Sequence, residues 1–328
     1  MLEPPSRDSR AEFARDFGQR VLLTVDTEEE FDWGGDFTRD RHGLSHVHAL
    51  MEFQLFCEGM GIVPLYLVDW PIITNERAVE IIGEAVKRGL AEVGVQLHPW
   101  VNPPLSEEIC ERNSFAGNLP ADLEREKFSR LRSAIEERFG APPRSYRAGR
   151  YGLGPNSARM LADNGIAIDT SVRANYDYSA GHGPDYSRHP LTPYWVEPGR
   201  RLLELPVTTV FWGMLRKQGR MLFPRLSKHP LLASAFSKFG LLERIPLTPE
   251  GTTSDEALRG LDMAIDDGLP IIVLSFHSPS LAVGHTPYVR SEEDLAALYD
   301  WLRTVYGYCE TRGVKPTSIA EIMQATIV

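Results

Sequence analysis

Two acidic residues directly follow an apolar run near the start of the chain. Residues 21–25 are almost continuously β-branched or aliphatic, which is typical of a strand buried on both faces of a parallel sheet. Asp26 and Glu28 come next, and the alternation of side chains along a strand places both on one face. Acids at the carboxyl end of a parallel strand are candidates for catalysis. The alternative is that residues 28–32 form a solvated loop or the first turn of a helix, where acids are favoured.

Polar side chains recur at other strand ends and in the loops that follow them. Taken singly, each has an ordinary explanation. His98 could be a core histidine with satisfied hydrogen bonds, Arg147 could pair with a loop carboxylate, and Asp169 could cap a helix. A barrel, however, gathers successive strand ends around one axis, so together they predict a single site. The set comprises Asp26, Glu28, Gln96, His98, Arg147, Arg150, Asp169 and His277.

Alternating strands and helices must position these groups. Apolar runs predict further buried strands at residues 62–68, 91–98, 166–169, 202–208 and 270–276. Helical periodicity and capping residues predict helices at 44–59, 75–89, 120–139, 156–164, 254–268 and 292–312. This alternation favours a parallel α/β sheet.

No repeat or linker divides the chain. We therefore expect an N-terminal extension at residues 1–19 and one domain at 20–328, with a helical insertion at about 211–250 that is either a lid or interface or an ordinary structural insertion. Residues 175–198 predict a long surface loop. Its tyrosines either stack on sugar faces or pack against one another.

Composition limits the class of partner. The chain has 328 residues and a formal net charge of -10, which argues against a nucleic-acid surface or an anionic membrane as a partner. Cys57, Cys110 and Cys309 are far apart, as expected for reduced thiols. No apolar leader or membrane-spanning run occurs in the sequence, so the expected location is the cytoplasm.

The sequence resembles the polysaccharide deacetylase family, also called the NodB homology or carbohydrate esterase family 4 group, and particularly its divergent members without a secretion signal. The resemblance runs from Val21 to about Ile322. The segments TVDTE, EVGVQLHPW, YRAGRYG, IDTS and VLSFHS resemble the five family motifs in order and spacing. It implies a distorted (β/α)₇ barrel and a hydrolase that removes N- or O-linked acetyl groups from sugars with a divalent metal, expected to be zinc.

The resemblance also implies residue roles. Asp26 would be the general base, oriented by Arg147, and His277 would be the general acid, positioned by Asp169. A backbone N–H near Tyr151 would help to stabilise the oxyanion. The substrate and oxyanion set is then Tyr151, Arg150 and Trp100.

Two of the family's metal ligands are absent, because Thr27 and Gln96 stand where an aspartate and a histidine are usual. The expected substitute is a divalent ion held by Glu28 and His98, with Asp26 nearby. Gln96 would hydrogen-bond a ligand or coordinate weakly through its carbonyl oxygen. A site without metal is the alternative.

Three functions follow from this reading. The first is a metal-assisted deacetylase acting on an acetylated sugar or glycan intermediate. The second is a metal-independent amide hydrolase of the allantoinase type, and the third is a non-catalytic glycan-binding barrel. Oligomers are possible, and the sugar and the type of acetyl linkage stay open.

Overall fold

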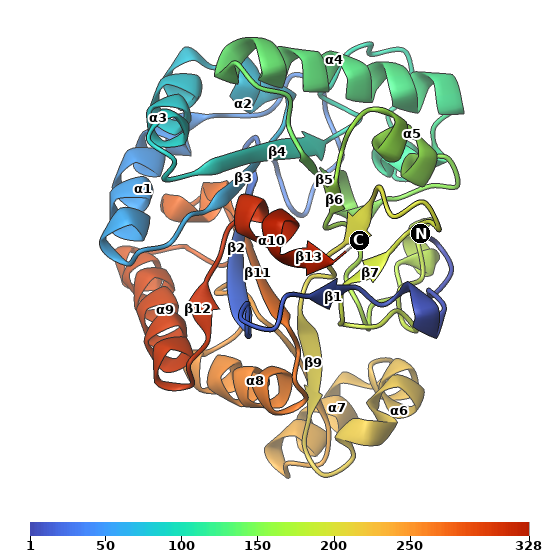
Figure 1. The fold of residues 1–328 in the computed structure, drawn as a ribbon, viewed down its shortest axis with the longest axis vertical. Coiled ribbons are helices and arrows are strands. Elements are labelled where there is room, and N and C mark those ends of the chain that lie inside the picture. The colour runs from blue at the N-terminus through green and yellow to red at the C-terminus, as the bar shows by residue number, and fades with distance from the viewer. Residues whose placement is uncertain (328) are drawn as a thin grey trace.

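Seven parallel strands form the centre of the molecule, in the order β11, β2, β3, β4, β5, β6, β8 (Figure 1). The structure is a computed structural model that describes residues 1–327. The strands are β2 (Arg20–Thr27), β3 (Leu65–Val68), β4 (Glu92–Leu97), β5 (Ser145–Ala148), β6 (Ile168–Asp169), β8 (Leu203–Glu204) and β11 (Ile271–His277). The same sheet includes β7 (Tyr194–Trp195), antiparallel to β8, and β12 (Lys315–Pro316), parallel to β2.

The sheet curls into an incomplete barrel. Between β8 and β11, Thr208 closes the gap: its N–H donates to the carbonyl of Val273 at 3.1 Å, and its hydroxyl accepts from the Val273 N–H at 2.9 Å. The segment around Thr208 thus takes the place of a direct pairing between β8 and β11. The predicted fold class, a distorted (β/α)₇ barrel, is confirmed.

Helices cover the outside of the sheet (Figure 1). The longer ones are α1 (Ala49–Gly59), α3 (Glu76–Lys87), α4 (Ala121–Phe139), α8 (Ser254–Asp266) and α9 (Glu292–Thr311), and the shorter ones are α2 (Trp70–Thr74), α5 (Ser157–Asp163) and α10 (Ile319–Ala325). Asn75 caps α3, because its side chain accepts a hydrogen bond from the Ala78 N–H at 2.9 Å. The apolar stripe of α3, which includes Ile81 and Ile82, is buried.

Strand register places the polar groups side by side. Each residue from Val21 to Val25 is at most 1% exposed, as expected for a strand covered on both faces. In the parallel pairing of β11 with β2, His277 lies opposite Asp26. In that of β4 with β5, Gln96 lies opposite Arg147. The carboxyl ends of these strands therefore meet, as the barrel argument requires.

Two regions differ from the sequence expectation. The strand expected at 202–208 is only Leu203–Glu204, since Thr208 leaves the ladder to bridge the gap in the barrel. Conversely, β5 has no apolar run in its sequence because its Arg147 side chain serves the site. Among residues 1–327, no helix combines the length and the hydropathy that a bilayer crossing requires.

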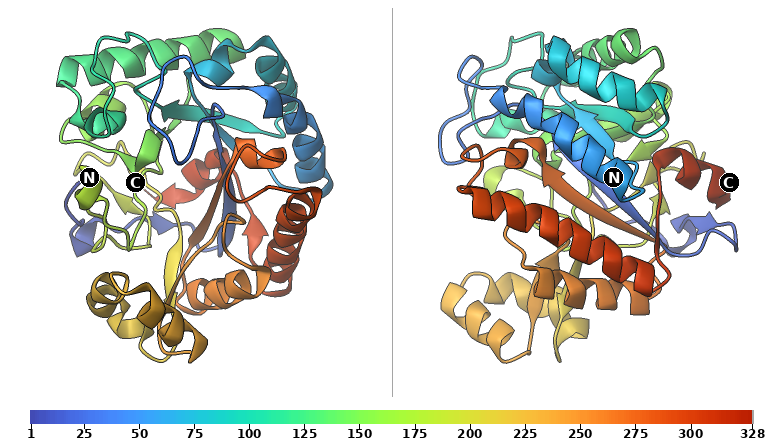
Figure 2. Two further views of the ribbon diagram at one scale, coloured as in Figure 1. Left: turned by 180° about the vertical axis from the view of Figure 1, so that it is seen from behind. Right: turned by 90° about the vertical axis from the view of Figure 1, so that its left-hand side faces the viewer.

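Shorter pairings complete the structure. The antiparallel pair β1 (Glu12–Phe13) and β13 (Thr326–Ile327) joins the two ends of the chain. A second antiparallel pair, β9 (Thr209–Trp212) and β10 (Glu243–Pro246), carries α6 (Gly219–Leu226) and α7 (Pro230–Lys238) between its strands. Both views of Figure 2 show α6 and α7 projecting from one end of the molecule.

Candidate active site

A cavity of about 320 Å³ lies where the central strands end. Its lining contains six residues of the strand-end set and two that the family resemblance implied: Asp26, Glu28, Gln96, His98, Arg150 and His277, and Trp100 and Tyr151. The buried Arg147 contacts Asp26 from behind. Asp169 does not line the cavity.

Arg147 holds Asp26 in place. The Arg147 side chain is fully buried, and its guanidinium makes five hydrogen bonds. One of these is to the Asp26 Oδ1, and the others are to Thr24, Ser275 and two oxygens of Thr170. Because every N–H of a guanidinium is used, Arg147 has no freedom to move, and the Asp26 carboxylate is fixed with it.

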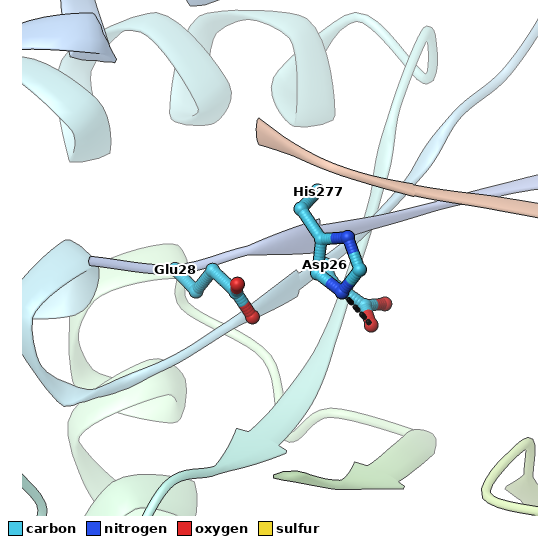
Figure 3. Close-up of side chains that lie close together, drawn as sticks. All are labelled: Asp26, Glu28 and His277. Atoms are coloured by element: carbon cyan, nitrogen blue, oxygen red, sulfur yellow. Dashed lines mark ion pairs between the residues drawn. The ribbon is translucent and has the colours of Figure 1, made fainter. Parts of the chain in front are cut away.

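His277 faces Asp26 across the cavity floor. Its Nε2 lies 3.8 Å from the Asp26 Oδ2 (Figure 3), and its Nδ1 lies 2.7 Å from the Glu250 Oε2. Burial alone lowers the pKa of His277, but the charge of Glu250 and its hydrogen bond outweigh burial, so this pKa lies above its ordinary value. Glu250 is itself held by the Ser280 hydroxyl at 2.6 Å.

The predicted positioning role of Asp169 is therefore wrong, because Glu250 occupies the place beside His277. Asp169 instead accepts from the Ser171 hydroxyl at 2.6 Å and lies opposite Glu204 in the β6–β8 pairing. Burial raises the pKa of Asp169, and burial together with the Asp169 charge raises that of Glu204 well above its usual range. Two facing buried carboxyl groups of this kind are expected to share a proton and brace the strands.

His98 has the tautomer of a metal ligand. Its Nδ1 lies 2.9 Å from the Glu29 Oε2, whose other oxygen accepts from the Trp100 indole N–H at 2.7 Å. The Nδ1 therefore carries the proton, which leaves a lone pair on Nε2, 3.4 Å from the Glu28 Oε2. Burial lowers the pKa of His98 to about 4, so the ring is neutral near pH 7.

Several hydrogen-bond acceptors converge beside His98. Gln96 donates its amide N–H to the Glu28 Oε2 at 3.0 Å, and its Nε2 is 3.3 Å from the His98 Nε2. Within residues 1–327, the Glu28 Oε1 and the Gln96 Oε1 are buried without a partner. Burial, reinforced by Asp26 and Glu29, raises the pKa of Glu28 well above its usual range. Unpartnered buried oxygens next to an imidazole lone pair fit a divalent cation.

Two three-residue groups have metal-ligand spacing. Asp26, Glu28 and His277 offer ligand atoms within 4.8 Å of one another (Figure 3), as do Glu29, Asp69 and His98. In the second group the oxygens are already in use, because Asp69 accepts from the Glu29 and Ile72 N–H groups. Glu29 and Asp69 therefore hold His98 rather than an ion.

The backbone after β5 is unusual. Arg150 and Tyr151 adopt φ values of 54° and 60°, which side-chain-bearing residues rarely do. Just before them, a Cβ at Gly149 would lie 2.4 Å from the His98 ring, so only glycine fits. Such strain next to a cavity is typical of functional sites.

Aromatic rings form much of the cavity wall. Trp100 stacks on His98 with ring centroids 4.4 Å apart, and Trp33 meets His277 edge-on at 4.8 Å. Of the tyrosines in the 175–198 loop, Tyr178 lines the cavity, whereas Tyr186 is buried and donates to the carbonyl of Tyr151. Other aromatic residues of the wall are Phe31, Phe37, Phe115, Tyr151 and Tyr288.

Sequence reasoning missed two charged residues of the site, Glu250 and Arg173. Both line the cavity. Glu250 follows the edge strand β10, after the irregular segment 211–242, so no apolar run marked it as a strand end. Arg173 packs over the rings of Tyr151 and Tyr176 at 5.3 and 4.1 Å. The only signal in the sequence was the position of Arg173, two residues beyond the IDTS motif.

No family model and no curated protein matches the chain. Solved structures do match. A "putative polysaccharide deacetylase" from Mycobacterium smegmatis is 17% identical over 97% of this chain and 98% of that one, with a TM-score of 0.47. A family 4 acetyl xylan esterase from Clostridium thermocellum, in complex with a cobalt ion, is 12% identical over 93% and 91%, with a TM-score of 0.44.

A third match is a carbohydrate esterase family 4 pseudoenzyme from Bacillus anthracis, 11% identical over 93% of this chain and 66% of that one, with a TM-score of 0.44. These structures include members of the family that the five sequence motifs resemble. At such low identity and TM-score, a function for this chain must rest on its own site.

Proposed function

We propose that the chain is a hydrolase that removes an acetyl group from a sugar or glycan, with Asp26 as general base and His277 as general acid. The facing pair of Asp26 Oδ2 and His277 Nε2, 3.8 Å apart in an aromatic cavity, is the observation that supports it. Each is held from behind by its own partner, Arg147 or Glu250. A binding module needs no such arrangement of base and acid.

The reaction uses the two groups in turn. Asp26 takes the proton of the attacking water as its oxygen adds to the acetyl carbonyl. The Nε2–H of His277 then protonates the leaving amine or alcohol as its bond to the acetyl carbon breaks, so acetate and the free sugar result. The hydrogen bond from His277 Nδ1 to Glu250 keeps the proton-bearing Nε2 directed into the cavity.

A divalent ion fits beside this pair. Glu28 and His98 would hold it, with the carbonyl oxygen of Gln96 if its amide turns over. When bound, such an ion would polarise the acetyl carbonyl. Glu29 would support such an ion indirectly, because its hydrogen bond keeps the His98 Nδ1 protonated and the lone pair on Nε2.

Zinc binding tests the ligand set. We expect Glu28→Ala and His98→Ala each to weaken zinc binding by roughly tenfold to a hundredfold or more, since even the groups that support ligands have effects of that order. Gln96→His should tighten binding, because imidazole is a better zinc ligand than an amide. Competition with a chromogenic chelator measures all three, and His229→Ala, at an exposed position, is the control.

Equal zinc affinity in the wild type and these variants would contradict the metal site. It would favour the second candidate, a metal-independent amide hydrolase. One observation supports that candidate: the Gln96 amide donates to Glu28 and is within reach of the His98 Nε2, where a cation would otherwise lie.

The pH dependence tests the role of Glu250. His277 must be protonated to act as an acid, so kcat/KM falls as pH rises through its pKa. Glu250→Gln removes the charge that raises this pKa, so the alkaline limb should move to lower pH. Glu250→Asp should retain part of the shift. Glu84→Gln, at an exposed position, is the control and should have the same pH profile as the wild type. If the alkaline limb does not move in Glu250→Gln, Glu250 does not set the pKa of the general acid.

A panel of N- and O-acetylated sugars and simple acetyl esters, with release of acetate as the readout, tests the activity itself. Release of acetate from a sugar, lost in the Asp26 and His277 variants, is the expected result. Turnover of cyclic amides instead would favour the second candidate.

A further inference from the structure

The segment from Phe211 to Leu242 differs in charge from the rest of the chain. It holds six of the 35 Lys and Arg residues and none of the 45 Asp and Glu residues. The overall charge of -10 hides this local positive charge. In the described part of the chain only Arg216 of the six forms an ion pair, with Asp267 at 2.9 Å. The others are Lys217, Arg220, Arg225, Lys228 and Lys238, and all are exposed.

The same segment carries the most exposed large apolar side chains. Leu231, Met214 and Phe239 are 90%, 81% and 78% exposed, and Met221 and Leu232 are exposed as well. None of the α7 side chains is fully buried. Figure 2 shows α6 and α7 projecting beyond the helices that cover the sheet. Apolar side chains gathered at a projecting tip mark an interaction surface.

We propose that α6 and α7 dock this protein onto an anionic lipid surface. Helices that combine Lys and Arg with exposed Leu, Phe and Met bind the boundary between headgroups and acyl chains, with the cations near lipid phosphates. A second copy joined through the same segment is disfavoured as the occupant, because it would bring two acid-free positive segments together. Nucleic acid would neutralise the charge but leave the apolar tip in water.

The insertion is fixed to the cavity. Arg244 stacks on Tyr176 and Phe223, with its charge 3.6 and 4.6 Å from the ring centroids, and donates to the Asn175 carbonyl at 3.0 Å. Pro246, the last residue of β10, lines the cavity, as do Leu247, Thr248 and Glu250, which follow it. Docking through α6 and α7 would therefore hold the cavity in a set position beside the bilayer.

Co-sedimentation of the full chain with vesicles tests the proposal. Vesicles of phosphatidylcholine with phosphatidylserine should bind the protein, vesicles of phosphatidylcholine alone should bind it much less, and added salt should weaken the binding. The double variant Lys228→Ala, Lys238→Ala should bind at least about tenfold more weakly, because each cation near the surface contributes about 1 kcal/mol. Leu231→Ser with Phe239→Ser should weaken binding by at least about tenfold through lost apolar burial.

Matched controls lie on other helices. Leu55→Ser replaces an exposed leucine of α1, and Lys87→Ala an exposed lysine of α3, and both should bind as the wild type does. Equal binding to both kinds of vesicle, or unchanged binding by the insertion variants, would overturn the proposal. So would self-association or nucleic-acid binding that depends on the insertion without vesicle binding. The test needs no turnover, so its result is independent of the proposed hydrolase.

Discussion

Asp26→Asn is expected to lower kcat/KM by roughly a hundredfold to ten-thousandfold, the usual scale for loss of a general base. Asparagine has nearly the same shape, and its carbonyl oxygen can still accept the hydrogen bond from Arg147. The fold should therefore be retained, and the loss should be chemical. His277→Ala should lower turnover by a similar factor, because the leaving group then lacks its proton donor. Acetate release from the best substrate of the panel is the measurement.

Asp177→Asn is the matched control. Asp177 is exposed on the 175–198 loop, and its Oδ1 accepts from the Ser179 N–H, a hydrogen bond that asparagine keeps. This variant should turn over substrate as the wild type does. Near-normal turnover by both Asp26→Asn and His277→Ala would rule out the assigned roles and would mean that other groups act as base and acid.

The parallel sheet could be predicted because its strands are buried on both faces. A continuous apolar run such as residues 21–25 has few alternatives to a central strand. The run also fixed where the strand ends, and parallel strands bring such ends to one edge. Asp26, His98 and His277 could therefore be grouped without knowing the register. The short strands β6 and β8 carry too few residues for their bounds to be predicted.

Positions held by long-range contacts could not be predicted in this way. Glu250 and Asp169 are both acids beside short strands, and only the folded chain shows that Glu250 reaches the Nδ1 of His277. Motif order placed Asp169 in that role, but its side chain faces Glu204. Likewise, the orientation of the Gln96 amide depends on its hydrogen bond to Glu28, which lies 68 residues earlier in the chain.

Net charge was a poor guide to surface chemistry. An average over 328 residues argued against an anionic membrane, whereas residues 211–242 are locally basic. The segment lacks clean helical periodicity because α7 buries no side chain fully against the barrel. The sequence did contain a signal: residues 211–242 combine apolar residues of weak helical periodicity with six basic residues and no acidic ones.

Arg147→Met is expected to destabilise the fold by about 3–5 kcal/mol, the usual cost of removing one partner of a buried ion pair. The Asp26 carboxylate would stay buried without its cation, and Thr24, Thr170 and Ser275 would each lose a hydrogen bond. Methionine keeps a similar length, so lost packing contributes little. Urea denaturation followed by circular dichroism measures the change in the free energy of unfolding.

Two further variants separate charge from packing. Arg159→Met breaks an exposed pair with Asp163, and should change stability by at most about 0.5 kcal/mol. The double variant Arg147→Met, Asp26→Asn has no uncompensated buried charge, so it should be more stable than Arg147→Met alone. If the double variant is the less stable of the two, Arg147 acts mainly through its bonds to Thr24, Thr170 and Ser275. The carboxylate of Asp26 would then be held by its position on β2, and Arg147 would lose its assigned role in orienting the base.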